Sequence, residues 1–253
     1  MIRTIINADD FGRDSSVNEA IGLCFEKRII TNTTLMVNMP YAMDAVRLAK
    51  SNGFEDRVGL HLNLTQGVPL TSSIRNFSSF CDGRGEFNAR FHLSTAGRLT
   101  IGPREAAALS EEIEAQIRRY LAFGLTEKHL DSHHHSHTDL SVWRLAEPLL
   151  KKYGFRSVRI SRNLFAEGKC SPVNRVYKHT YNRRLRRTGM LCADYFGSYR
   201  DFCAAIDSIE EDCLTEMMLH PMFSPEGDLV DTHTPMDEIV SFTRDRQLML
   251  QTY

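Results

Sequence analysis

Residues 128–139 (KHLDSHHHSHTD) bring five histidines and two aspartates into twelve positions. Soluble proteins rarely concentrate imidazole in this way without a metal ion or a proton to handle. This histidine-rich stretch is therefore the first candidate for a wall of a functional site.

Four further candidate residues lie far from the histidine-rich stretch. Asp9 and Asp10 follow a short apolar run. His61 lies on the polar face of a strictly alternating segment at residues 58–65, and His220 ends a later apolar run. Taken singly, each has an ordinary explanation as a turn, a cap or a surface residue. Together they indicate one site, provided that the fold brings them to the same place.

An aspartate with two neutral histidines is a suitable ligand set for one divalent ion, such as Zn²⁺, Mn²⁺, Co²⁺ or Fe²⁺. His61, His133 and His220 are the candidate imidazoles, and one member of the Asp9–Asp10 pair is the candidate carboxylate. The other aspartate of the pair would then act as general base toward a water molecule. Asp131, two residues before His133, is expected either to orient a ligand histidine or to form an ordinary hydrogen bond at the strand end.

Segments typical of strands alternate with segments typical of helices along the chain. Apolar or alternating runs predict seven strands, and stripes of apolar residues at helical spacing predict the helices. The predicted strands are residues 4–8, 33–38, 58–65, 128–139, 157–160, 190–193 and 215–219, and the predicted helices are residues 15–27, 40–51, 104–124, 140–153, 199–209 and 236–251. This order predicts an α/β fold with a parallel sheet, either closed as a (β/α) barrel or open and doubly wound. In both folds the carboxyl ends of the strands share one edge, where the candidate residues would meet.

Two irregular regions, at about 66–103 and 163–188, interrupt the alternation within what we expect to be a single domain of residues 1–253. A region as long as the first is typical of a lid, a binding loop or an inserted subdomain. Its aromatic residues are expected to form a small core of their own rather than to stack on a ligand: Phe77, Phe80, Phe87 and Phe91. Three histidines in the predicted loops are expected to be exposed to solvent: His92, His179 and His233.

The composition gives no support for several classes of partner. The chain has 253 residues and a net charge of −1, which gives no reason to expect a nucleic-acid or anionic-membrane partner. It has no run of eighteen apolar residues and no signal-peptide pattern at its start, so we expect a cytoplasmic protein that does not span a membrane.

The six cysteines are scattered without a CxxC pair, which favours reduced thiols over disulfides or a zinc-thiolate site.

Six short segments, in this order along the chain, resemble the YdjC-like carbohydrate deacetylases, which include the chitooligosaccharide deacetylases. They are NADDFG, TNTTLMVN, GLHLNLT, HLDSHHHSH, DYFGSY and EMMLHP, and the resemblance covers the chain from residue 5 to about residue 221. The resemblance implies a TIM-barrel-like fold with an irregular or incomplete ring of about seven parallel strands and helices outside. It also implies a hydrolase that removes an N-acetyl group from an amino sugar or a short oligosaccharide and releases acetate.

The resemblance assigns a role to each candidate residue. It places the metal ligands at Asp10, His61 and His133, and the general base at Asp9. The general acid that protonates the leaving amine falls on His220, with Glu216 as a partner through the strand. One divalent ion is implied, Mg²⁺ or Zn²⁺, with Mn²⁺ or Co²⁺ as alternatives. Leu219 stands where relatives often have cysteine.

The remaining histidines of the histidine-rich stretch are placed by strand alternation. His135 and His137 share the parity of His133 and are expected to line the sugar pocket, whereas His134 is expected to point away. Two other functions stay open, a metal-dependent phosphoesterase or amidohydrolase on the same barrel and a non-catalytic sugar-binding or metal-binding protein. A homodimer is also left open.

Overall fold

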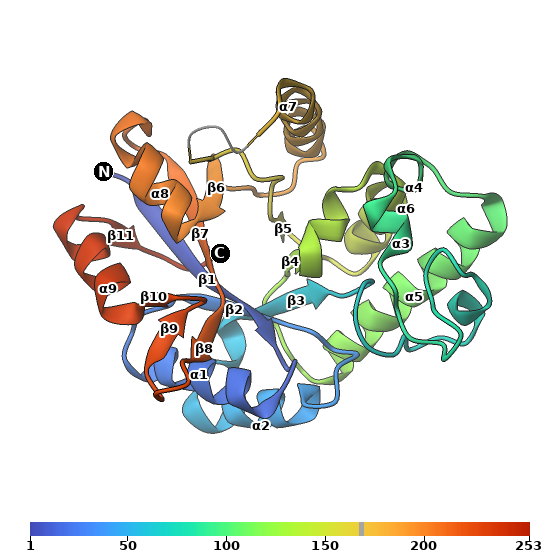
Figure 1. Ribbon diagram of the computed structural model, residues 1–253, viewed down its shortest axis with the longest axis horizontal. Coiled ribbons are helices and arrows are strands. Elements are labelled where there is room, and N and C mark those ends of the chain that lie inside the picture. Colours follow the sequence, from blue (N-terminus) through green and yellow to red (C-terminus); the bar gives the residue numbers. More distant parts are fainter. Residues whose placement is uncertain (167–169) are drawn as a thin grey trace.

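Seven parallel strands form a curled sheet that does not close into a complete ring (Figure 1). The computed structural model describes residues 1–166 and 170–253. The strand order across the sheet is β5-β4-β3-β2-β1-β7-β6. The strands are β1 (Arg3–Phe11), β2 (Asn32–Leu35), β3 (Val58–Leu62), β4 (His129–Ser132), β5 (Ser157–Val158), β6 (Tyr195–Ser198) and β7 (Leu214–Leu219). This arrangement confirms the predicted barrel-like α/β fold with an incomplete ring.

Helices surround the sheet on its outside (Figure 1). Asp14 caps α1 by accepting a hydrogen bond from the Val17 backbone N–H. Trp143 on α6 is fully buried, as expected of a core residue. The principal helices are α1 (Ser15–Glu26), α2 (Ala42–Asn52), α5 (Pro103–Ala122), α6 (Leu140–Lys152), α7 (Pro172–Arg186), α8 (Tyr199–Ala205) and α9 (Met236–Asp245).

Two predictions on the carboxyl-terminal side of β5 were wrong. The region expected to be irregular at 163–188 contains α7, which begins at Pro172 after the capping residue Ser171. The helix buries only Tyr181, Asn182 and Leu185, so its apolar stripe is too narrow to be seen in the sequence. Residues 190–193 were predicted to form a strand, but they make only a single bridge, from Leu191 to Ser157. The strand in this part of the chain is β6, which begins at Tyr195.

Three very short strands form a second, antiparallel sheet that the sequence did not indicate. They are β8 (Pro221–Phe223), β9 (Leu229–Asp231) and β10 (Thr234–Pro235), and β8 packs against α1. The predicted last helix ends early, at Asp245, and β11 (Met249–Leu250) then pairs with the start of β1. Strands of two or three residues are too short for a periodicity to be recognised.

The insertion at 66–103 does not have a separate core, so that prediction was wrong. It contains η2 (Ser73–Asn76), α3 (Arg90–Leu93) and α4 (Thr95–Leu99). Its buried residues Phe80, Phe87 and Phe91 join the main hydrophobic core, and Phe77 is partly buried against that core. The buried Glu112 on α5 accepts hydrogen bonds from the Leu70 and Thr71 backbone N–H groups and thus holds the insertion against the domain.

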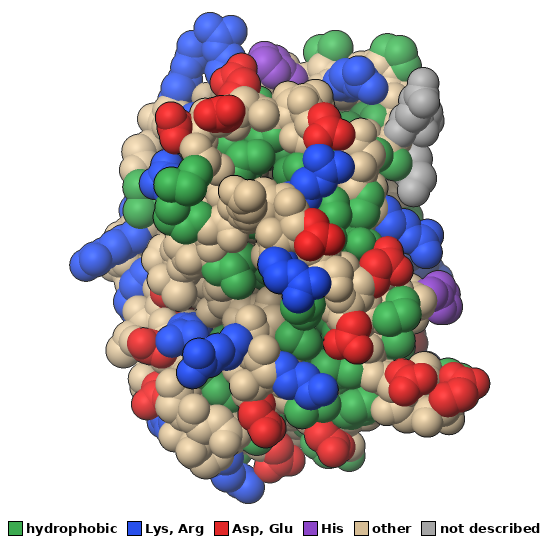
Figure 2. Space-filling model, turned by 90° about the vertical axis from the view of Figure 1, so that its left-hand side faces the viewer, with side chains coloured by type: hydrophobic (Ala, Val, Ile, Leu, Met, Phe, Trp, Pro, Cys, Tyr) green, Lys and Arg blue, Asp and Glu red, His purple; other side chains and the backbone are tan. Residues whose placement is uncertain are grey.

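The surface over α8 and α9 mixes acidic, basic and apolar side chains without a large patch of one charge (Figure 2). In the described residues none of the six cysteines is paired in a disulfide. In the described part of the chain, no helix combines the length and the apolar composition needed to cross a membrane.

Candidate metal centre

A distortion at the end of β1 brings two consecutive aspartates to one cavity. In a regular strand Asp9 and Asp10 would point to opposite faces. Asp10 instead has a φ of 71°, and the register with β2 shifts between Ala8 and Phe11, so both carboxylates line the same cavity of about 730 Å³. Gly12 permits the tight turn that follows, because a Cβ there would lie 3.1 Å from Ala42 Cα.

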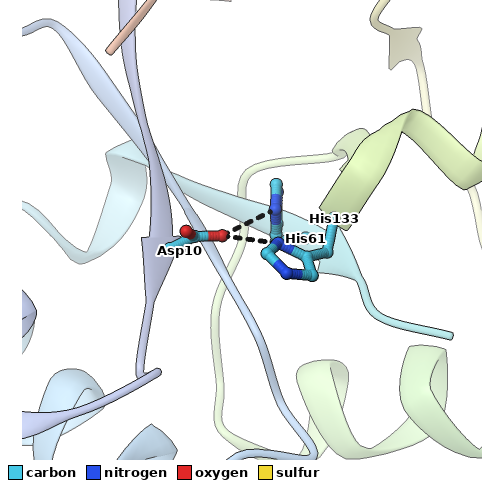
Figure 3. Close-up of side chains that lie close together, drawn as sticks. All are labelled: Asp10, His61 and His133. Carbon is cyan, nitrogen blue, oxygen red and sulfur yellow. Dashed lines mark hydrogen bonds and ion pairs between the residues drawn. The ribbon is translucent and has the colours of Figure 1, made fainter. Parts of the chain in front are cut away.

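Asp10, His61 and His133 converge in this cavity (Figure 3). Asp10 Oδ1 lies 2.8 Å from His133 Nδ1 and 3.3 Å from His61 Nε2. Arg13 donates to the other carboxylate oxygen, Oδ2, over 2.9 Å. Burial opposes ionisation of Asp10, but the hydrogen bond from His133 and the nearby imidazole of His61 outweigh it and keep its pKa below the usual range. One ionised carboxylate and two imidazoles are suitable ligands for a divalent ion.

The environment of His61 fits a bound cation. Asp131 Oδ1 lies 2.7 Å from His61 Nδ1, and because a carboxylate only accepts, Nδ1 carries the hydrogen. The other ring nitrogen, Nε2, is buried and has no hydrogen-bond partner in the described part of the chain. Burial lowers the pKa of His61, but Asp131 and Asp10 outweigh burial and raise it to about 10. A proton on Nε2 would compete with a metal ion for this nitrogen, so metal binding would have to displace it.

Arg159, directly after β5, organises the carboxylates beside this centre. Its guanidinium lies 2.7 Å and 2.8 Å from the two oxygens of Asp9 and 2.8 Å from Asp131 Oδ2, and its Nε donates to Glu216. Asn7 also donates to Asp9, over 2.8 Å. Burial opposes ionisation of Asp9, but Arg159 outweighs it and keeps the pKa of Asp9 below the usual range. Burial raises the pKa of Glu216, which accepts a second hydrogen bond from the Tyr253 hydroxyl.

Two other groups of potential ligands, Asp9–His61–Asp131 and His129–Asp131–Glu216, lie nearby. Both consist largely of carboxylates that Arg159 already neutralises. A cation would be repelled by the guanidinium at either position. The group of Asp10, His61 and His133 is therefore the candidate metal centre.

The histidine-rich stretch departs from strand geometry after Ser132. His134 and His135 have left-handed backbones, with φ values of 53° and 58°, so His133, His134 and His135 all line the cavity. His135 thus faces the cavity as predicted, and the prediction that His134 points away was wrong. His137 was also predicted wrongly, since it is buried against Ser132 and the Arg159 carbonyl. Strand parity failed because the strand ends one residue before His133.

His220 and His92 both line the cavity. His220 lies between β7 and β8, as its place in the sequence predicted, but Glu216 binds Arg159 and Tyr253 rather than His220. The prediction that His92 is exposed was wrong, because its ring binds the buried Asp139. His179 and His233 are exposed, as predicted.

Sequence reasoning missed Arg159, Arg13 and His92. An arginine within the apolar run SVRI is a signal for a buried charge, and Arg13 directly follows NADDFG. His92 has no comparable signal, because only the docking of the insertion brings it to the cavity.

Comparisons with known proteins agree with this architecture. The family model described as YdjC-like protein matches residues 3–251. The carbohydrate deacetylase of Geobacillus stearothermophilus is 35% identical over 222 residues, which cover 87% of this chain and 79% of the relative. The carbohydrate deacetylase of Thermoanaerobacter pseudethanolicus is 27% identical over 266 residues, which cover 98% of this chain and 97% of the relative.

A crystal structure of a putative cellobiose-phosphate cleavage protein from Enterococcus faecalis V583 superposes with a TM-score of 0.71. It is 21% identical to this chain, and the superposition covers 99% of this chain and 97% of the other, so it supports the fold alone. The match of the family model over nearly the whole length decides the relationship. This chain belongs to the YdjC-like protein family.

Proposed function

We propose that this protein is a metal-dependent carbohydrate deacetylase, which hydrolyses the N-acetyl group of an amino sugar or short oligosaccharide and releases acetate. The observation that supports this most directly is the pairing, in one cavity, of the Asp10–His61–His133 group with a second carboxylate, Asp9. Relatives that are 35% and 27% identical are carbohydrate deacetylases, which supports the same reaction class.

Asp10, His61 and His133 would hold one divalent ion. Such an ion supplies Lewis acidity, which polarises an acetyl carbonyl and acidifies a water molecule. The ligand set accepts Mg²⁺, Zn²⁺, Mn²⁺ or Co²⁺, and the supply of metal decides among them.

Asp9 takes the proton from the attacking water in this proposal. Arg159 and Asn7 hold its carboxylate in a fixed orientation, and its lowered pKa keeps it ionised at neutral pH. An ionised carboxylate at the cavity wall is able to orient a water molecule and accept its proton. Arg159 is then a positioning residue, which acts through Asp9.

His220 protonates the leaving amine. An amide nitrogen leaves poorly as an anion, so hydrolysis needs an acid beside it. His220 lines the same cavity as Asp9 and comes from the neighbouring strand, since β7 pairs with β1.

The test is release of acetate from N,N′-diacetylchitobiose, with and without a chelator. We expect chelation to abolish the release and one equivalent of a divalent ion to restore it. The double variant Asp10→Ala, His61→Ala should be inactive, and full activity in that variant would contradict the assigned centre. Release of phosphate from phosphate esters, without acetate release, would identify a phosphoesterase instead.

The role of His220 is tested separately. We expect His220→Ala to bind metal like the wild type while losing turnover. Loss of metal in this variant would make His220 a ligand and remove it from the acid role.

A further inference from the structure

The insertion at 66–103 reaches the cavity of the metal centre through α3. Ala89, His92 and Leu93 form part of the cavity wall, facing the residues that come from the sheet. Of these three, only His92 has a side chain that can form a hydrogen bond. The insertion therefore contributes one polar group to the cavity.

A buried carboxylate holds His92 in a single orientation. Asp139 is fully buried, and its Oδ2 lies 2.5 Å from His92 Nδ1. Its other oxygen accepts from Arg98 Nε over 2.6 Å. Because a carboxylate only accepts, Nδ1 of His92 carries the hydrogen. Nε2 is then the ring nitrogen left for the cavity, and it has no hydrogen-bond partner among the described residues.

His92 stands at a distance from the metal centre along a row of imidazoles. The rings of His133 and His134 have centroids 4.0 Å apart, and those of His134 and His92 are 6.5 Å apart and nearly parallel at 14°. Thr65 Oγ1 lies 3.0 Å from His134 Nδ1 and fixes the middle ring. The ring of His134 thus lies between His92 and the metal ligand His133.

The insertion is docked by several contacts besides that of His92 with Asp139. Arg98 binds Asp139, Ser141 donates to the Gly97 carbonyl over 2.6 Å, and Glu112 holds the start of the insertion. These contacts attach the insertion at both of its ends. The second ring nitrogen of His92 has no part in any of them.

We propose that His92 is a substrate-binding residue, whose Nε2 accepts a hydrogen bond from a sugar hydroxyl group while Asp139 and Arg98 hold the ring in place. Oriented polar groups on an otherwise fixed wall are what carbohydrate recognition requires, since hydroxyl groups are read by hydrogen bonds. Asp139 and Arg98 act as positioning residues. The inference rests on the proposed deacetylase function and names the part of the insertion that contacts the substrate.

Two variants separate contact with substrate from docking of the insertion. His92→Asn places an amide where Nδ1 stands, so it keeps the hydrogen bond to Asp139 and removes the nitrogen that faces the cavity. His92→Gln places its amide near the position of Nε2. The exposed His179→Ala on α7 is the matched control. All variants are first compared with the wild type in thermal unfolding.

For N,N′-diacetylchitobiose we expect His92→Asn to raise KM about tenfold, with kcat within about twofold, because one hydrogen bond to substrate is lost. We expect His92→Gln to recover part of the loss and His179→Ala to match the wild type. A KM for His92→Asn equal to that of the wild type, at equal Tm, would overturn the assignment. A changed Tm with a normal KM would reduce His92 to a docking residue.

Calorimetric binding of N,N′-diacetylchitobiose to the full chain distinguishes failure of this inference from failure of the proposed function. If the wild type releases no acetate with any divalent ion, the proposed function fails and affinity decides the role of His92. About tenfold weaker binding by His92→Asn would then support the contact with sugar. Equal affinities, or no binding by the wild type, would overturn it.

Discussion

Asp131 Oδ1 lies 2.7 Å from His61 Nδ1, and the two residues are direct neighbours in the parallel ladder between β3 and β4. The sheet register itself thus directs His61 Nε2 toward Asp10. Thr34, on β2, donates to the other oxygen of Asp131 over 3.0 Å and helps to fix the carboxylate beside its histidine. Three adjacent strands therefore hold one candidate metal ligand in place.

The pairing of Asp131 with His61 predicts a loss of metal affinity in Asp131→Asn. The variant removes the carboxylate that fixes the orientation of His61, and such changes typically cost about 10- to 100-fold in affinity. Competition with a chromophoric chelator measures the effect. Glu216→Gln is the matched control, because Glu216 shares Arg159 but does not contact His61. If the metal affinity of Asp131→Asn lay within about threefold of that of Glu216→Gln, the loss would be smaller than the roughly 10- to 100-fold expected. Asp131 would then not be the residue that orients His61 for metal binding.

Replacement of Asp9 should separate turnover from metal binding. We expect Asp9→Asn to keep its metal and to lose roughly 10²- to 10⁴-fold in kcat, the usual range for a general base. Metal content by elemental analysis and acetate release on the same sample give both readouts. Asp10→Asn, its neighbour, should lose the metal as well. Turnover by Asp9→Asn within about tenfold of the wild type would remove Asp9 from the base role.

Arg159 should be essential to stability as well as to the site. It is fully buried, and it neutralises carboxylates that are themselves almost completely buried. Removing one partner of a buried ion pair typically costs about 3–5 kcal/mol, because the remaining charges are left without compensation. We expect a loss of this size for Arg159→Leu in urea unfolding at neutral pH. The exposed Arg118→Ala should leave the midpoint nearly unchanged, and similar midpoints for the two variants would contradict the prediction.

Acidification should destabilise the protein through its buried histidines. Burial lowers the pKa of His137 from 6.5 to about 3, and burial also holds the pKa of His129 well below 6.5. Between pH 6.5 and about 3, His137 takes up a proton in the unfolded chain but not in the folded chain. The free energy of unfolding therefore decreases as the pH falls below 6.5.

The pH dependence of Tm for His137→Gln tests this explanation. The glutamine side chain would keep a donor for the Arg159 carbonyl but cannot titrate, so we expect a smaller loss of Tm between about pH 7 and 4.5 than in the wild type. His179→Gln, at an exposed site, should follow the wild type. Identical slopes for the wild type and His137→Gln would assign the acid sensitivity to other groups.

The barrel-like architecture and the meeting point of the candidate ligands could be predicted from the sequence. Strands alternate with helices, and Asp10, His61 and His133 each come at or just beyond the end of a strand. Since the carboxyl ends of parallel strands share one edge, the order of the motifs was enough to place these residues together. Periodicity failed for α7 and for the strands β8 to β10, where the buried stripe is narrow or the strand is very short.

The detailed environment of the site depends on contacts between distant segments, which no local pattern records. Asp9 and Asp10 share a cavity because β1 bulges against β2, and His134 enters it because the chain turns left-handed after β4. The partner of Asp9 is an arginine 150 positions away, and His92 arrives only because the insertion docks on Asp139. Local sequence specifies strand ends and residue types, whereas ion pairs, backbone distortions and docked loops are decided by the packing of the whole chain.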